Sequence, residues 1–127
     1  MLVTGLMLMA VGVLLAFTAE ATARGRLGLN SFMGLRFGYL VASDEAWYAG
    51  HRAARIPLVL SGVVVFIAGV ILMLAQPNDN AANVVVGVAM GVLLLLVIVA
   101  AVIGNRAARD EFARSLTDDA AKNDAAV

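Results

Sequence analysis

The chain has no cysteine, a single lysine and a single histidine among its 127 residues. Without cysteine it has no disulfide, no thiolate nucleophile and no cysteine-ligated metal. His51 has Asp44 and Glu45 near it in the sequence, but Asp44 is seven positions away and no further ligand is in sight. We therefore expect no metal site and no cofactor. We expect His51 to be a hydrogen-bonded or hydrated side chain at the membrane interface.

Charge is absent from three long apolar runs, residues 2–19, 56–75 and 84–103. The runs are 18, 20 and 20 residues long, and about 20 apolar residues cross the hydrocarbon core as a helix. Helices satisfy their own backbone hydrogen bonds in lipid. The sequence thus predicts an all-α membrane protein with three transmembrane helices. The lack of ionisable residues inside the runs argues against a pump, a proton-coupled transporter or an intramembrane protease.

Basic residues are missing from the start of the chain and from the linker 76–83. Five arginines lie in 24–55, and three arginines and the lysine follow residue 103. Because lysine and arginine near a span resist translocation, they accumulate in cytoplasmic loops. The sequence therefore predicts that the N-terminus is outside and the C-terminus is in the cytoplasm.

The first apolar run also has features of a signal peptide, since the small residues 21–23 resemble a cleavage site. However, no basic residue precedes the run, and its 18 residues exceed the usual apolar region of about 7–15. Cleavage would leave the arginine-rich segment outside, against the charge rule. We therefore interpret the run as a retained membrane anchor.

These patterns divide the chain into four segments. The segments are a first transmembrane helix (1–23), a cytoplasmic-side loop with a short amphipathic interfacial helix (24–55), a transmembrane hairpin of helices two and three (56–104) and a partly disordered cytoplasmic tail (105–127, disordered from 117).

The interfacial helix has a clear start and an ambiguous end. Ser43 is a suitable N-cap, and Asp44 and Glu45 lie in the first turn, where the helix dipole favours anions. Pro57 disfavours helix at the residue before it. It therefore either begins the second span or kinks a continuous helix. Trp47 and His51 share one helical face, and we expect Trp47 and Arg52 to anchor this helix at the headgroup layer.

Arg36 lies between two glycines in an otherwise apolar loop. A guanidinium there needs a carboxylate, a carbonyl or a lipid phosphate. We favour a structural salt bridge over direct ligand binding. Three acidic residues are possible partners: Glu20, Asp44 and Glu45. Glu20 is also four positions before Arg24, so it either pairs with Arg24 on one helical face or is simply a solvated helix end.

Small residues suit helix packing in two places. Gly5, Gly12 and Ala16 form a candidate packing strip on the first span. Gly87 and Gly91 have the GxxxG spacing that lets helices approach closely. We expect the latter pair to pack within the chain more readily than against a second copy.

Eight residues of the middle segment keep a distinctive spacing: Asn30, Gly34, Arg36, Ser43, Glu45, Trp47, His51 and Arg52. This pattern, followed directly by a membrane hairpin, resembles the SdpI family of bacterial integral membrane proteins. The resemblance implies a location in the bacterial cytoplasmic membrane and makes these residues a possible binding surface. The member that gives the family its name confers immunity to a secreted peptide toxin and holds a soluble repressor at the membrane.

No serine has a local base or a nucleophile-elbow context, and residues 25–28 lack the lysine of a phosphate-binding loop. Our leading hypothesis is a non-enzymatic, SdpI-like protein that acts by binding, either in toxin immunity or by tethering a cytoplasmic partner. The alternative is a small accessory subunit of a large bacterial membrane complex, such as a respiratory assembly. Either function implies the lipid bilayer and a protein as partners, and no nucleic acid.

Overall fold

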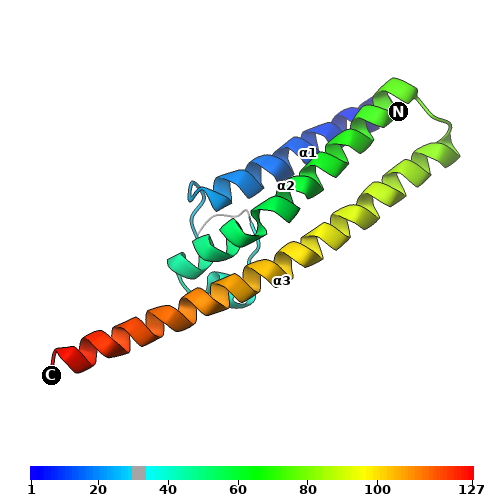
Figure 1. Cartoon of the computed structure of the whole chain (residues 1–127). Helices are drawn as coiled ribbons and strands as arrows, with labels where there is room; N and C mark the ends of the chain where they lie inside the picture. Colours follow the sequence, from blue (N-terminus) through cyan, green and yellow to red (C-terminus); the bar gives the residue numbers. More distant parts are fainter. Residues whose placement is uncertain (30–33) are drawn as a thin grey trace.

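The computed structural model describes residues 1–29 and 34–127 (Figure 1). The described part contains no β-strand. Its helical elements are α1 (Leu2–Ala23), the short 3-10 helix η1 (Gly38–Val41), α2 (Asp44–Ala75) and α3 (Asp79–Ala125). By length and composition, α1, α2 and α3 are each able to cross a membrane. The predicted all-α class with three membrane helices is confirmed.

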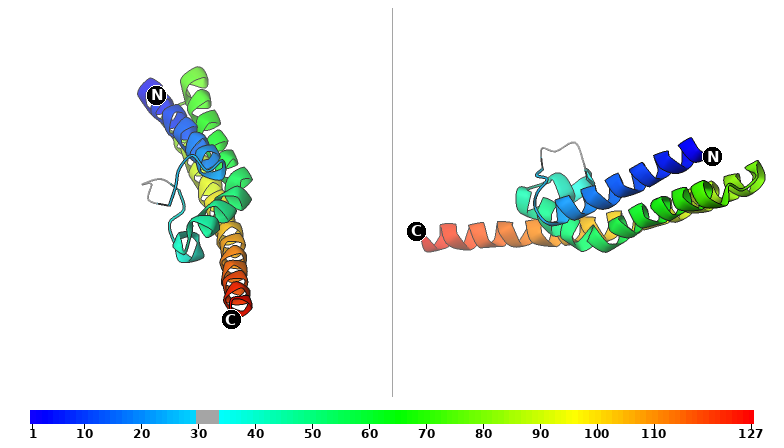
Figure 2. Two further views of the ribbon diagram at one scale, coloured as in Figure 1. Left: turned by 90° about the vertical axis from the view of Figure 1, so that its left-hand side faces the viewer. Right: turned by 90° about the horizontal axis from the view of Figure 1, so that it is seen from above.

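α2 is the central helix of the molecule. It packs against α1 on one side and α3 on the other, whereas α1 and α3 do not pack against each other. Both neighbours run antiparallel to α2, so the N-terminus lies near the turn between α2 and α3 (Figures 1 and 2). The C-terminus lies at the far end of α3, well beyond the loop that joins α1 to α2.

Glycines bring the backbones of α1 and α2 into direct contact. A Cβ atom added to Gly12 would lie 2.6 Å from the carbonyl oxygen of Gly62, and one added to Gly69 would lie 2.6 Å from that of Gly5. A Cβ on Gly62 would also lie 2.6 Å from the amide nitrogen of Ala16. The predicted packing strip on the first span is therefore present, and its partner is a matching pair of glycines on α2.

A third glycine contact joins α2 to α3 at the level of the loop. A Cβ atom on Gly50 would lie 2.9 Å from the carbonyl oxygen of Gly104, and one on Gly104 would lie 3.1 Å from that of Gly50. Close backbone approach of this kind replaces side-chain interdigitation where lipid gives helices no hydrophobic reason to associate.

The start of α2 follows the prediction, since the hydroxyl oxygen of Ser43 accepts a hydrogen bond from the amide of Ala46 at 3.1 Å. The helix then continues through Pro57 without a break. Of the two alternatives at this proline, the structure has the continuous helix. The interfacial helix and the second span are thus one element of 32 residues.

α3 is longer at both ends than its apolar run. It begins at Asp79, directly after Asn78, whose side-chain oxygen accepts a hydrogen bond from the amide of Ala81 at 3.0 Å. It ends at Ala125, where the sequence predicted a tail disordered from residue 117. The last part of the helix is rich in alanine, the residue with the highest helix propensity, which accounts for the difference.

The predicted packing of Gly87 and Gly91 within the chain is wrong. A Cβ atom added to either glycine would meet no described atom within 4 Å. The buried residues of this part of α3 are Ala82 and Ala89, which lie on the side that faces α2. The GxxxG pair lies on a different side of the helix, and both glycines are exposed.

Candidate functional site

The loop between α1 and α2 is organised around two aromatic side chains from the first turns of α2. Trp47 and His51 are fully buried, and their ring centroids are 4.1 Å apart. Ala54, one turn further along, is buried as well, so the face predicted from the sequence is the buried face of the helix. Trp47 therefore supports the loop from within and does not face the headgroup layer as expected.

His51 holds one arm of the loop through both ring nitrogens. The amide of Leu35 donates a hydrogen bond to Nε2 at 3.0 Å, and Nδ1 lies 2.9 Å from the carbonyl oxygen of Trp47. Because Nε2 accepts, a neutral ring carries its proton on Nδ1 and donates it to that carbonyl. Both nitrogens are therefore engaged by the protein. No group of three or more metal-ligating side chains occurs among the described residues.

Trp47 holds the other arm. Its Nε1–H donates a hydrogen bond to the carbonyl oxygen of Leu27 at 2.9 Å. Leu27 and Leu35 lie on either side of residues 30–33, so neighbouring side chains on one helical face attach both arms of the loop to α2. Asn30, the first residue of the family pattern, lies outside the described residues.

Gly34 is required where the loop passes over these rings. Its φ is +104°, in the region that side chains other than hydrogen rarely adopt. A Cβ atom would also lie 2.7 Å from Nε2 of His51 and 3.1 Å from Cη2 of Trp47. Any other residue would push the loop away from the hydrogen bond between Leu35 and His51.

Arg36 does not form the salt bridge predicted for it. In the part of the chain that the structure describes, no carboxylate lies within ion-pair distance of its side chain. Its guanidinium carbon instead lies 6.0 Å from the centre of the Trp47 ring, within the range of a cation–π contact. The side chain is exposed, so solvent reaches the guanidinium while it lies over the indole.

Glu20 is engaged elsewhere, which explains why Arg36 lacks it. The Arg55 guanidinium donates two hydrogen bonds to the Glu20 carboxylate, at 2.7 and 2.8 Å, and Arg24 donates a third at 2.6 Å. Of the two possibilities at Glu20, pairing with Arg24 is the one present. The pair with Arg55 crosses 35 positions and was not found from the sequence. It joins the end of α1 to α2.

Asn105, on α3, is a site residue that the sequence did not reveal. Its side-chain oxygen accepts a hydrogen bond from the amide of Tyr39, in η1, at 2.9 Å. Gly38 has a φ of +55°, and a Cβ there would lie 2.5 Å from the same oxygen. Leu40 is fully buried and packs with Ala108 of α3. The loop is thus attached to α3 as well as to α2.

The remaining residues of the pattern have simpler places. Ser43 caps α2, and Glu45 and Arg52 are exposed on its first turns. The outer surface of the loop also carries three large apolar side chains that are each at least 40% exposed: Phe37, Tyr39 and Val41. The arrangement therefore has a buried polar framework and an exposed surface that combines arginine with aromatic and aliphatic groups.

A three-helix membrane protein with a folded, arginine-bearing loop between its first two spans is the class that these features define. The family model of the SdpI/YfhL proteins matches residues 26–104, and the chain belongs to this family. The match covers nearly all of the loop, all of α2 and α3 as far as Gly104. Neither the curated proteins nor the solved structures provide a match.

Proposed function

We propose that the chain acts by binding a protein or peptide partner, without catalysis, and that the surface of the loop is where it binds. The observation that supports this proposal is that different residues of the site support the loop and form its exposed surface. Trp47, His51 and Asn105 hold its backbone by hydrogen bonds, while Arg36 and Phe37 are exposed. A rigid support beneath an exposed arginine and aromatic group is typical of protein recognition surfaces.

The charge pattern supports a cytoplasmic location for this surface in a bacterial membrane. Five arginines lie in 24–55 and four basic residues follow the third apolar run, whereas the segments at the other end of the helices carry none. With this orientation the loop and the C-terminal end of α3 both face the cytoplasm. A soluble regulator would meet the loop directly, and a peptide toxin would reach it from the membrane.

Membership in the SdpI/YfhL family supports toxin resistance or the tethering of a cytoplasmic regulator as the biological role. The test is a pull-down of the tagged protein from native membranes in mild detergent, with mass spectrometry of the co-purifying proteins. We expect a soluble regulator or a peptide at less than one copy per chain. Arg36→Ala should lose it, whereas Arg114→Ala, which removes the same charge from an exposed site on α3, should retain it. Equal recovery by both variants would contradict the proposal.

A second candidate function is that of an accessory subunit in a larger membrane assembly. The exposed pair Gly87 and Gly91 favours it, because a GxxxG face without a partner in its own chain suits close approach of a helix from another subunit. In this case the same pull-down would recover a large complex at fixed stoichiometry. Gly91→Leu would then release the complex while Arg36→Ala would not.

A further inference from the structure

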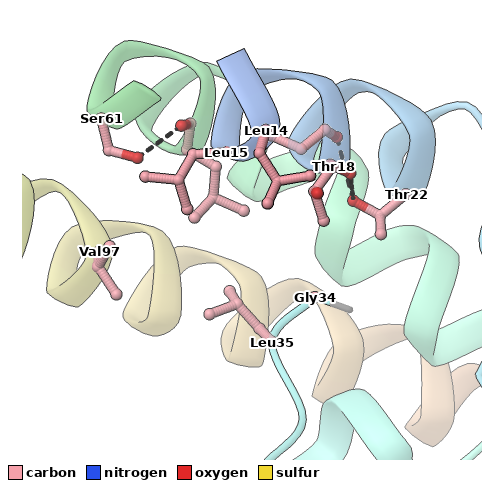
Figure 3. Close-up of a pocket in the computed structure, with 10 residues that line it drawn as sticks. Leu14, Leu15, Thr18, Thr22, Gly34, Leu35, Ser61 and Val97 are labelled. Carbon is pink, nitrogen blue, oxygen red and sulfur yellow. Dashed lines mark hydrogen bonds between the residues drawn. The ribbon is translucent and has the colours of Figure 1, made fainter. Parts of the chain in front are cut away.

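A side pocket opens between α1 and α3, because these two helices do not pack against each other. Its volume is about 340 Å³. Figure 3 shows Leu14 and Leu15 of α1 on one side of it, with Val97 of α3 and Leu35 of the loop on the other. The loop therefore borders the end of the pocket that lies towards the arginine-rich side.

The walls of this pocket suit hydrocarbon. Most of the lining side chains are aliphatic, and the hydroxyl groups of Ser61 and Thr22 donate to carbonyl oxygens of their own helices, at 2.6 and 2.8 Å (Figure 3). No buried side-chain nitrogen or oxygen in the described residues lacks a hydrogen-bond partner. The part of an occupant that lies between these walls is therefore apolar.

The size of the pocket separates the possible apolar occupants. The pocket is a partly open groove of about 340 Å³, and a helix with its side chains is about 10–12 Å in diameter. A transmembrane helix from a second copy or from a partner would cover such a groove without filling it. A single flexible hydrocarbon chain is narrow enough to lie along it.

The charge at the loop end of the pocket indicates which polar group the bound hydrocarbon chain carries. Arg36 directly follows Leu35, which lines the pocket. Its side chain is exposed and has no carboxylate partner among the described residues. The segment 24–55 contains five arginines and only two acidic residues, Asp44 and Glu45. An anionic phosphate at this level would provide the partner that the guanidinium lacks.

We infer that this pocket is a binding site for one phospholipid with an anionic headgroup. One acyl chain lies between α1 and α3, against Leu15 and Val97, and the headgroup phosphate lies against Arg36. The lipid fills the space between the two helices that do not meet. It also connects the membrane-embedded part of the protein to the loop.

Native mass spectrometry of the full-length protein tests this inference. The protein, stripped of lipid in detergent, is offered equal amounts of phosphatidylglycerol and phosphatidylcholine with identical acyl chains. We expect one phosphatidylglycerol per chain to remain bound in preference to phosphatidylcholine. Arg36→Gln should lower that preference by about fivefold, as expected for one basic residue at an anionic headgroup. Arg114→Gln should leave it unchanged.

Substitutions on α3 test the part of the site that would hold the acyl chain. Val97→Phe narrows the pocket and should weaken phosphatidylglycerol binding by about tenfold. Val99→Phe, the same change on a part of α3 that does not line the pocket, should have no effect. A second measurement uses the wild-type protein, so misfolding of a variant cannot affect it. The wild-type protein should retain long-chain phosphatidylglycerol and release the short-chain form. Equal binding of the two headgroups, indifference to chain length, or a lipid-free dimer would overturn the inference. None of these readouts depends on a protein partner.

Discussion

The two ends of the molecule are held together by different forces. Among the apolar runs, α1 and α2 meet through glycines whose backbones touch. At the loop end, the contacts come from polar side chains. His51, Trp47 and Asn105 each form a hydrogen bond with a backbone group far away in the sequence. The packing of the membrane half thus depends on its glycines, whereas the loop depends on particular polar groups.

Substituting a glycine between α1 and α2 should have the largest effect. We expect Gly12→Leu to prevent the two helices from packing, because the first added atom would lie 2.6 Å from backbone atoms of α2. The cost should exceed the roughly 1–3 kcal/mol that is typical of overpacking. Thermal unfolding in detergent measures it. Gly87→Leu is the matched control, since its Cβ meets nothing, and equal loss in both variants would contradict the comparison.

Removing the indole should have the next largest effect and should be confined to the loop end. Trp47→Ala deletes a fully buried side chain, its hydrogen bond to Leu27 and the support of Arg36. Aromatic-to-alanine changes in cores cost about 3–5 kcal/mol. Limited proteolysis should show new cleavage in 24–43 while α1, α2 and α3 stay associated. Phe37→Ala, at an exposed aromatic residue of the same loop, should leave the pattern as in the wild type.

Removing the hydrogen bond between the Leu35 amide and His51 should have a smaller effect. Substitutions at His51 separate the contribution of this hydrogen bond from that of packing. His51→Leu keeps the volume but leaves the amide of Leu35 without an acceptor, at a cost of about 1–3 kcal/mol. His51→Gln supplies an amide oxygen and should recover part of the loss. Amide hydrogen exchange at Leu35 is the direct measurement. Exchange that is as slow in His51→Leu as in the wild type would show that the bond contributes nothing.

Removing the ion pairs of Glu20 should have the smallest effect on stability. The carboxylate and its two arginine partners are all solvent-accessible, so water and salt screen their attraction. We expect Glu20→Gln to lower the unfolding temperature slightly at low salt and to match the wild type at high salt. A difference that persists at high salt would mean that the cluster stabilises the protein in some other way. Asp110→Gln, at an exposed pair within α3, is the control.

Local sequence patterns determined the helices. The three uncharged runs are long enough to cross a membrane and have no other way to satisfy their backbone groups in lipid, so the number and type of elements followed directly. The cap at Ser43 and the shared helical face of Trp47 and His51 depend only on residues within a few positions of one another, whereas the burial of that face under the loop was not predicted. For the same reason the family pattern was readable before the fold was known.

Only the tertiary structure decided which surfaces meet. The bond from Tyr39 to Asn105 crosses 66 positions, and the pair of Glu20 with Arg55 crosses 35. A local sequence pattern spans only a few positions, so it cannot predict contacts between residues that are this far apart in the sequence. The rotation of α3 about its axis decided that Gly87 and Gly91 are exposed, although their spacing is that of a packing motif. A helix of uniformly apolar residues has no strong preference for one face, so its orientation comes from the backbone contacts at Gly50 and from the loop.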